Sequence, residues 1–221
     1  MGLFGSGVEI KTPDQIAVMR EAGLVVGRTL DVLRAAVAPG VTTGELDALA
    51  HDTITEHGAT SNFLGYGAHH GAGGFPGVIC TSVNDEVVHG IPGPRVLRDG
   101  DVVSIDCGAI VGGWHGDAAI TVAVGDVPDE VTELMRITEE AMWRGIASAS
   151  LGGRVGDIGQ AVETYVRSQG EYGIVEGYTG HGIGSAMHQP PDVHNVAGRG
   201  RGPRLEPGLA LAVEPMVTLG S

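Results

Sequence analysis

Positive charge is scarce in this sequence. Lysine and arginine number 13 against 27 aspartates and glutamates, the formal net charge is −14, and Lys11 is the only lysine. Such an acidic chain is poorly suited to grip a phosphate backbone, which argues against specific DNA binding. The one basic cluster, GRGRGPR with Arg199, Arg201 and Arg204, is interpreted as a solvated loop, with contact to nucleic acid or an acidic partner as the alternative.

Cysteines and long apolar runs are scarce as well. Cys80 and Cys107 are too few for a disulfide framework, which is typical of a reducing cytoplasm. No run approaches the roughly 20 apolar residues of a membrane span. The start, MGLFGSGVEIK, lacks the charged and apolar regions of a secretory signal. We therefore expect a soluble cytoplasmic protein with no membrane partner.

The sequence does contain enough apolar residues to form a core, since they make up 42% of the chain. Its length predicts a single domain over 1–221. Thr12 to Gln15 supplies an N-cap, a proline at the first helical position and a capping-box glutamine. These signals predict a helix over about 13–37. A second capping box, Thr42 with Glu45, predicts a shorter helix that ends at Gly58.

The two halves of the chain resemble each other at a shift of 112 residues. The aligned pairs are Gly40 with Gly152, Gly44 with Gly156, Glu45 with Asp157, Leu46 with Ile158, Ile54 with Val166 and Gly58 with Gly170. A second long helix over about 128–148 completes the repeat. The pattern predicts a duplicated α+β unit, with halves at about 12–125 and 126–221 and a cleft along its pseudo-twofold axis.

Two aspartates lie in a mostly apolar segment, SIDCGAIVGGWHGDAAITV (104–122). The runs 101–111 and 114–124 are rich in β-formers and are separated by Gly112-Gly113, which predicts a hairpin. With a two-residue turn, Asp106 faces Ala119 and Asp117 lies two residues away on the same face; a slip of two would place the aspartates directly opposite. Either register makes Asp106 and Asp117 neighbours.

Two neighbouring carboxylates repel unless a cation lies between them. Between Val96 and Leu134 the only basic residue other than histidine is Arg98, outside the hairpin. A divalent cation is the simplest partner. The alternative is a pair of solvated turn aspartates, which suits Asp117 after Gly116 better than Asp106 in mid-strand.

Histidines beside glycines and a late glutamate add to this pattern. The segment 177–195 carries His181 and His188, and the glycines beside His181 leave its imidazole uncovered by neighbouring side chains. The segment 84–92 carries His89 before a glycine. The run 209–215 is predicted as an apolar strand ending in Glu214. Taken singly, each histidine is an ordinary structural residue, as we expect of His51, His57 and His115. The combination is what indicates a metal site.

These motifs together carry a specific resemblance. YTGHGIGSAMHQPPDVHNV, the two hairpin aspartates, NDEVVHGIP, EPGLALAVEPM and IKTPDQIAVMREAG are similar, in order and spacing, to type I methionine aminopeptidases. The resemblance extends over the chain from about residue 10. It implies the α+β pita-bread fold, in which two halves surround a central metal cleft.

The resemblance also implies roles for single residues. Asp106 would chelate one metal ion and Asp117 would bridge two, while His181 and Glu214 would hold the other. Oxygen donors with one imidazole suit Mn, Fe(II), Co or Zn. Two close cations would turn a shared water into a hydroxide that attacks the first peptide bond. Glu214 would pass the proton to the leaving amine, and His89 and His188 would hydrogen-bond the substrate amide and the oxyanion.

A methionine side chain needs a narrow apolar slot. By position in the resemblance, its walls would include Phe63, Tyr66, Phe75, Cys80 and Met187. The alternative for each is an ordinary core residue. The loop 65–75 is longer than in the family and adds His69 and His70, which we interpret as part of a glycine-rich surface loop.

One departure concerns a fifth ligand. The family carries a bridging glutamate on a later strand, whereas this sequence ends at Ser221. We therefore expect weaker binding of the second ion, an exposed sheet edge, and doubtful activity for the chain ending there.

The resulting functional hypothesis is removal of the initiator methionine from nascent proteins whose second residue is small, by a cytoplasmic monomer, with the ribosome as a further candidate partner. Two alternatives stay open. One is a proline-directed peptidase of the same fold. The other is a catalytically silent binding protein, for which the absent glutamate argues and the retained site residues do not.

Overall fold

The structure is a computed structural model that describes residues 7–68, 73–198 and 200–220. Its chain forms two compact units. The first unit comprises Ala17–Thr132, and the second unit comprises Met1–Ile16 together with Glu133–Ser221. Residues 7–16 therefore belong with the later part of the chain. The expected halves at 12–125 and 126–221 stay a prediction.

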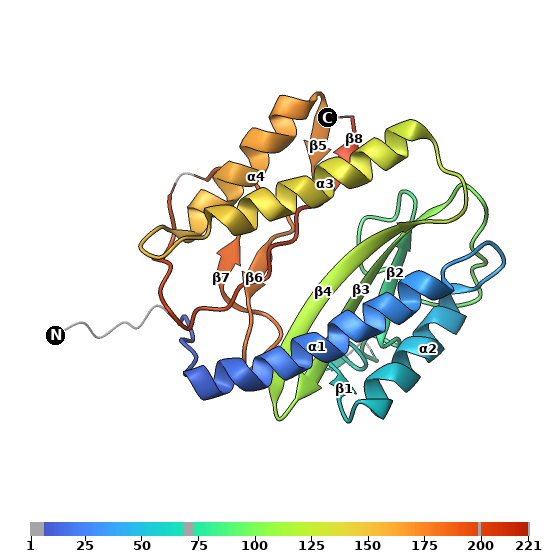
Figure 1. The fold of residues 1–221 in the computed structure, drawn as a ribbon, viewed down its shortest axis with the longest axis horizontal. Helices are drawn as coiled ribbons and strands as arrows, with labels where there is room; N and C mark the ends of the chain where they lie inside the picture. The colour runs from blue at the N-terminus through green and yellow to red at the C-terminus, as the bar shows by residue number, and fades with distance from the viewer. Residues whose placement is uncertain (1–6, 69–72, 199, 221) are drawn as a thin grey trace. The chain divides into compact units, whose positions relative to one another are not determined.

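The first unit is built on an antiparallel sheet. Its elements are α1 (Pro13–Ala36, from Ala17 onward), α2 (Thr43–Glu56), β1 (Thr60–Ser61), β2 (Ile79–Val83), β3 (Val102–Val111) and β4 (Trp114–Ala123). β3 is central: β4 pairs along one edge, and β2 and β1 pair along the other. Figure 1 shows this sheet beside α1 and α2. The hairpin predicted over 101–124 is confirmed.

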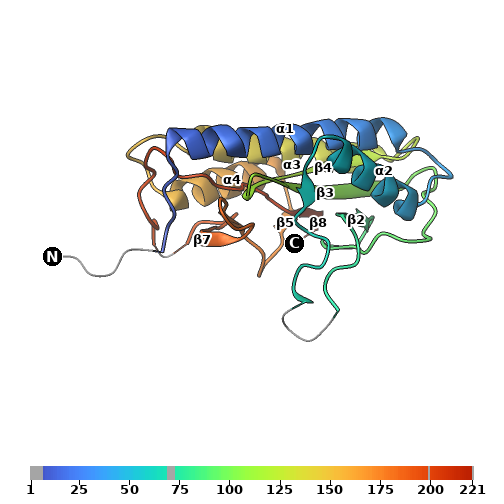
Figure 2. The same cartoon turned by 90° about the horizontal axis from the view of Figure 1, so that it is seen from below.

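Alternation along β3 separates the core from the opposite face of the sheet. Val103, Ile105, Cys107 and Ala109 are fully buried and form one cluster with apolar residues of α1 and α2. Both helices lie on the same side of this sheet (Figure 2). Successive strand residues point to opposite faces, so Ser104 and Asp106 belong to the face away from these helices.

Local capping signals explain where the helices begin. Thr12 N donates to Gln15 Oε1 at 2.8 Å, and Gln15 N donates to Thr12 Oγ1 at 3.3 Å, so the predicted capping box opens α1. Thr42 and Glu45 form the same reciprocal bonds at α2. Both predicted helices are confirmed to within a residue or two.

The second unit contains two helices and short strands. Its elements are α3 (Asp129–Ser148, from Glu133 onward), α4 (Val155–Gln169), β5 (Tyr172–Ile174), β6 (Gly180–Gly182), β7 (Gln189–Val193) and β8 (Val217–Leu219). β5 pairs with β8 and β6 pairs with β7, both antiparallel. Apolar residues of α3 and α4 pack with Ile174, while another part of α4 packs with Val193 and Leu205.

The internal repeat is confirmed around α2 and α4, which begin 112 residues apart. The glycines that precede them, Gly40 and Gly152, both have positive φ, 97° and 83°. Thr42 forms an isolated bridge with Val96, and Arg154 forms one with Arg204. In each unit, a later segment of the chain therefore pairs with the residue just before the helix; we call it the returning segment.

The next glycine pair repeats as well. Gly44 N donates to Gly93 O at 2.8 Å, and Gly156 N donates to Arg201 O at 2.9 Å. A Cβ at either position would lie 3.0 Å from backbone atoms of the returning segment, so glycine permits the close approach in both units.

The basic cluster belongs to the returning segment at α4. Arg201 donates to both carboxylate oxygens of Asp157, at 2.7 and 2.8 Å, and its side chain is largely exposed. This agrees with a solvated loop that also closes the helix start. Arg199 lies outside the described residues.

The predicted strand over 209–215 is wrong. Leu211 forms only an isolated bridge with Gly182, Ala212 N donates to His181 O at 2.8 Å, and the strand β8 begins at Val217. Leu209, Leu211 and Val213 do pack against the cluster around α4. The apolar pattern therefore correctly indicated that one face of an extended segment is packed. It did not indicate a strand, because a strand also needs a continuous backbone partner.

Candidate metal and catalytic site

The turn between β3 and β4 sets the relation of the two aspartates in the first unit. Gly112 and Gly113 have φ of 55° and 81°, as a two-residue hairpin turn with positive φ at both central positions requires. Asp106 pairs with Ala119, and Gly108 pairs with Asp117. The predicted register is confirmed, and Asp106 and Asp117 lie on the same face, opposite the helix-packed core.

Cys80, on β2, pairs with Asp106, on β3. Burial raises the pKa of the Cys80 thiol to about 12, and the negative charges of Asp106 and Asp117 act in the same direction. His115 lies two residues before Asp117; burial lowers its pKa although Asp117 opposes that shift. This end of the sheet face is therefore an environment of negative potential, which attracts cations.

His181 lies on β6 in the second unit, and its flanking glycines have a steric role. A Cβ on Gly180 would be 2.3 Å from Ala212 O, and one on Gly182 would be 2.4 Å from Pro190 O. Glycine thus lets neighbouring backbone approach β6 closely. His181 is only 6% exposed, and since residues 180 and 182 carry no side chains, this burial comes from packing with other segments.

His181 and Glu214 form a pair with the donor chemistry of a metal site. His181 Nδ1 donates to Gly182 O at 2.9 Å, so in the neutral ring Nε2 is an acceptor. Glu214 Oε1, also an acceptor, lies 3.3 Å from Nε2. Two acceptors stand this close when a proton or a cation joins them. Ligands about 2.1 Å from one ion are roughly 3 Å apart, so the spacing fits a shared metal.

Two further residues lie close to this pair. The His188 ring packs edge-on against the His181 ring with centroids 4.3 Å apart. Asn195, 3% exposed, donates its Nδ2 to Glu214 O at 3.1 Å. Asn195 was missed by the sequence reasoning, because nothing in its local pattern relates it to a residue 19 positions away. It fixes the backbone from which Glu214 projects.

His89 lies in the first unit, in an exposed loop after β2. Its φ is 58°, one of two positive values among described non-glycine residues. A non-glycine residue is held in this region only by its surroundings, and such strain is frequent at functional sites. The next residue supplies the restraint: Thr81 N donates to Gly90 O at 2.8 Å, and Gly90 N donates to Ser82 Oγ at 3.1 Å.

The predicted slot residues differ in their surroundings. Phe63, Cys80 and Met187 are buried, Phe75 is half-buried, and Tyr66 is 51% exposed. Phe75 N donates to Tyr66 O at 2.9 Å, which closes the base of the loop between them. Their role in substrate binding stays a prediction. His69 and His70 lie outside the described residues.

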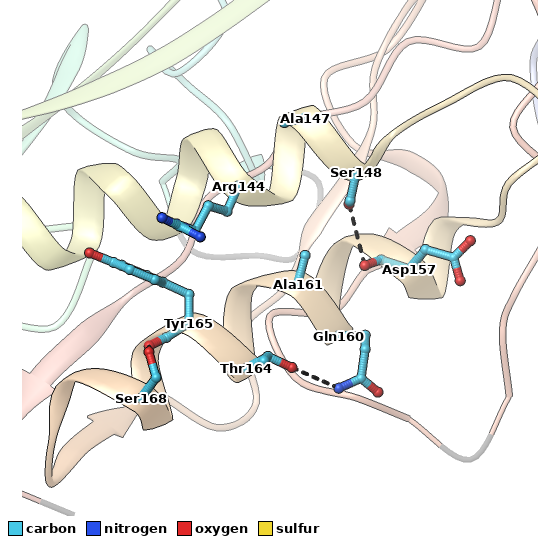
Figure 3. A pocket seen from close by; sticks show the side chains of 9 residues that line it. All are labelled: Arg144, Ala147, Ser148, Asp157, Gln160, Ala161, Thr164, Tyr165 and Ser168. Atoms are coloured by element: carbon cyan, nitrogen blue, oxygen red, sulfur yellow. Dashed lines mark hydrogen bonds between the residues drawn. The ribbon is translucent and has the colours of Figure 1, made fainter.

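A surface groove of the second unit lies away from these residues. It measures about 560 Å³, runs between α3 and α4, and is lined by residues such as Arg144, Ser148 and Tyr165 (Figure 3). Its polar groups already have partners: Ser148 donates to Asp157 O at 3.3 Å and Gln160 donates to Thr164 Oγ1 at 3.0 Å. This groove contains no predicted site residue and is a solvated helix surface.

The four predicted ligands come two from each unit. Among the described residues, neither unit by itself gathers three His, Cys, Asp or Glu side chains into a group that could hold a metal ion. The carboxylates and the imidazole nonetheless fit a first-row divalent ion, since each is an oxygen or nitrogen donor of the preferred kind.

An α+β chain with this donor set is typical of a metal-dependent hydrolase. The chain belongs to metallopeptidase family M24, whose model matches residues 17–220. It is 48% identical over 213 residues to methionine aminopeptidase from Clostridium acetobutylicum, covering 96% of this chain and 82% of that protein. It is 44% identical to methionine aminopeptidase 1 from Bacillus subtilis, with the same coverage.

Solved structures agree with the sequence relatives. The crystal structure of methionine aminopeptidase from Rickettsia prowazekii superposes with a TM-score of 0.91 at 40% identity, covering 97% of this chain and 84% of that one. Prolidase from Pyrococcus furiosus has a TM-score of 0.81 at 20% identity, and the match covers 58% of the prolidase chain. This likeness concerns the fold alone. The α+β pita-bread fold implied by the resemblance is therefore confirmed.

Proposed function

We propose that this M24 metallopeptidase removes the N-terminal methionine from polypeptides whose second residue is small. The observation that carries the proposal is the His181–Glu214 pair at 3.3 Å, found in a chain 40–48% identical to several proteins named methionine aminopeptidase. Family membership makes the reaction metal-dependent peptide hydrolysis.

We propose that two divalent ions, of Mn, Fe(II), Co or Zn, are held by Asp106, Asp117, His181 and Glu214. The bonded Nδ1 of His181 fixes the ring so that Nε2 is available as a ligand. When bound, such ions polarise a carbonyl oxygen and lower the pKa of water. The negative potential around Asp106 and Asp117 supports their assignment to this set.

The protein's own side chains then handle protons and charge. Glu214 is proposed to accept the proton of the attacking water and deliver it to the leaving amine, because a carboxylate can do both in sequence. His89 and His188 are proposed to donate hydrogen bonds to the substrate amide and to the developing oxyanion. The contact of His188 with the His181 ring supports its place beside the reacting group.

Selectivity for methionine is proposed to come from an apolar slot lined by Phe63, Tyr66, Phe75, Cys80 and Met187. The high pKa of Cys80 keeps its thiol neutral at physiological pH, as an apolar wall requires. An unbranched thioether is flexible enough to enter a narrow slot that excludes β-branched side chains.

The proposed substrates are nascent polypeptides, met in the cytoplasm by a monomer, with the ribosome as a candidate docking partner. Among the described residues, no helix has the length and apolar character of a membrane span. The net charge of −14 implies that any ribosome contact would involve basic protein surfaces rather than RNA phosphates.

The test is release of methionine from a Met-Gly-Met peptide with added manganese or cobalt. We expect His181→Gln and Asp106→Asn to lower kcat/KM by about a thousandfold or more, since each removes a ligand. His51→Gln, on the exposed face of α2, is the matched control and should retain activity.

Isothermal titration of the metal-free protein should give one tightly bound ion and a second, weaker one, and fewer bound ions in both ligand variants. Absence of methionine release by the unaltered protein with any of the four metals would contradict the proposal. Preferential cleavage of Xaa-Pro peptides would indicate the proline-directed alternative instead.

A further inference from the structure

Lys11, the only lysine of the chain, is buried in the second unit. Its side chain is 1% exposed. Lysine is rarely buried without a partner, because desolvating an ammonium group is costly. Lys11 Nζ donates to Glu9 O at 3.1 Å and to Gln189 Oε1 at 3.3 Å, and lies 3.6 Å from the Glu9 carboxylate.

The Glu9 carboxylate extends this network to Ser185, before β7, and to Gln189, the first residue of β7. Its Oε2 accepts from Ser185 N at 3.0 Å and from Gln189 Nε2 at 2.8 Å, while Oε1 accepts from Ser185 Oγ at 2.7 Å. We call Glu9, Lys11, Ser185 and Gln189 the N-terminal clip. It joins residues that are about 180 positions apart in the sequence.

The packing around the clip leaves little room for movement. A Cβ on Gly184 would lie 2.2 Å from Glu9 Oε2 and 2.3 Å from Lys11 Cε. Lys11 N also donates to Gly208 O at 2.8 Å. The segment 9–11 is therefore fitted between residue 184 and residue 208, and small shifts on either side would break contacts.

The charge on Glu9 favours a closed clip. Burial alone would raise the pKa of Glu9. Hydrogen bonds from Ser185 and Gln189, together with the charge of Lys11, outweigh this and lower the pKa to about 2. Glu9 is therefore ionised throughout the neutral range and remains an acceptor for all three hydrogen bonds.

The clip holds both sides of His188. Ser185 lies three residues before His188 and Gln189 directly follows it, while Met187 is buried and the His188 ring touches the His181 ring. The clip thereby holds Ser185 by its backbone N–H and hydroxyl, and Gln189 by its side-chain amide, on either side of His188. An exposed side chain would otherwise sample several rotamers.

From this arrangement we infer that Glu9 and Lys11 are positioning residues, which hold His188 in the orientation that the reaction uses. This inference rests on the proposed function, in which His188 donates to the substrate. Because that hydrogen bond strengthens in the transition state, loss of the clip should lower kcat while KM changes little.

The experiment compares Lys11→Met and Ser185→Ala with the unaltered protein. Glu140→Gln, which removes an exposed ion pair with Arg144 on α3, is the matched control. For Lys11→Met we expect kcat on Met-Gly-Met to fall about tenfold or more, with KM within about twofold, since small displacements of a catalytic group are costly. Ser185→Ala should show a smaller fall, and Glu140→Gln none.

Two readouts do not depend on turnover. In the zinc-loaded protein, the NMR signal of the His188 ring is assigned by its loss in His188→Gln. In Lys11→Met and Ser185→Ala, this signal should move away from the position that the ring current of His181 imposes. Because Lys11 is the only lysine, an amine-reactive reagent labels just Lys11 and the N-terminus. Labelling of Lys11 should be slow in the unaltered protein and several-fold faster in Ser185→Ala.

The outcomes separate the two proposals. A His188 signal and a kcat that stay unchanged in both clip variants would overturn the positioning role. Circular dichroism identifies a variant that fails to fold; Ser185→Ala, an exposed and mild change, then decides alone. Lack of methionine release by the unaltered protein would overturn the proposed function, while the NMR and labelling results would still report on the clip.

Discussion

Gly116 shows how a single residue without a side chain supports the candidate site. It lies on β4 one position before Asp117, and a Cβ there would be 2.6 Å from Gly23 N and 2.7 Å from Ala22 C on α1. The strand backbone therefore rests directly on the helix backbone. The position of Asp117 on the sheet depends on this contact.

Substitution at this contact gives a prediction with an internal control. Gly116→Ala should destabilise the protein by about 1–3 kcal/mol, because the methyl group forces β4 away from α1. Gly27→Ala, at an exposed position of the same helix with open space around it, should stabilise the protein by about 0.5–1 kcal/mol. Thermal or urea unfolding of both variants checks the pair; equal effects of the same sign would contradict it.

The β3–β4 hairpin is the element that brings two distant carboxylates to one face. A two-residue turn with positive φ at both glycines fixes the pairing, and a slip of one residue would send the strand's side chains to the opposite faces. The turn therefore fixes the face on which both proposed metal ligands lie.

A prediction for this element uses one site with two replacements. Gly113 has φ of 81°, and a Cβ attached there would meet open space, so any cost of a side chain comes from backbone conformation. Asn tolerates this region and Gly113→Asn should cost little, whereas Gly113→Val should cost about 1–2 kcal/mol. Unfolding experiments measure the cost, and calorimetric titration should show weaker metal binding for the valine variant only. Equal metal affinities would contradict the link between turn and site.

Local patterns predicted the elements whose causes are local. The capping boxes at Thr12 and Thr42 indicated the helix starts, and Gly112-Gly113 indicated the hairpin with Asp106 opposite Ala119. The segment at 209–215 failed because apolar alternation carries no information about a backbone partner. The N-terminal clip and the bond from Asn195 to Glu214 were missed because they join residues far apart in sequence, and only the lone lysine was a visible signal.

At the scale of the whole molecule, the excess of acidic residues dominates. A net charge of −14 on a 22.6 kDa chain implies self-repulsion that opposes the compact state at neutral pH. The exposed ion pairs, such as Arg95 with Glu86, offset little of it. At 0.1 M ionic strength the Debye length is about 10 Å, so salt largely screens repulsion between exposed charges that are farther apart than this.

Thermal unfolding should therefore respond to salt in a pH-dependent way. Between about 0.02 and 0.3 M sodium chloride at pH 7, we expect Tm to rise by roughly 2–4 °C, equivalent to about 1 kcal/mol for a chain of this size. Near pH 4.9, the isoelectric point of the sequence, the same addition should have almost no effect. An equal rise at both pH values would show that the salt acts through something other than net charge.

The two faces of β3 have a consequence for how this enzyme can change over time. Val103, Ile105 and Cys107 are committed to the core, while Asp106 between them is turned away from it. Neighbouring positions of β3 therefore have to satisfy different requirements. A variant library across this strand should fall into two alternating classes, one that limits soluble yield and one that limits turnover in well-folded protein. The face with the proposed ligands can then be redesigned without rebuilding the core beneath it.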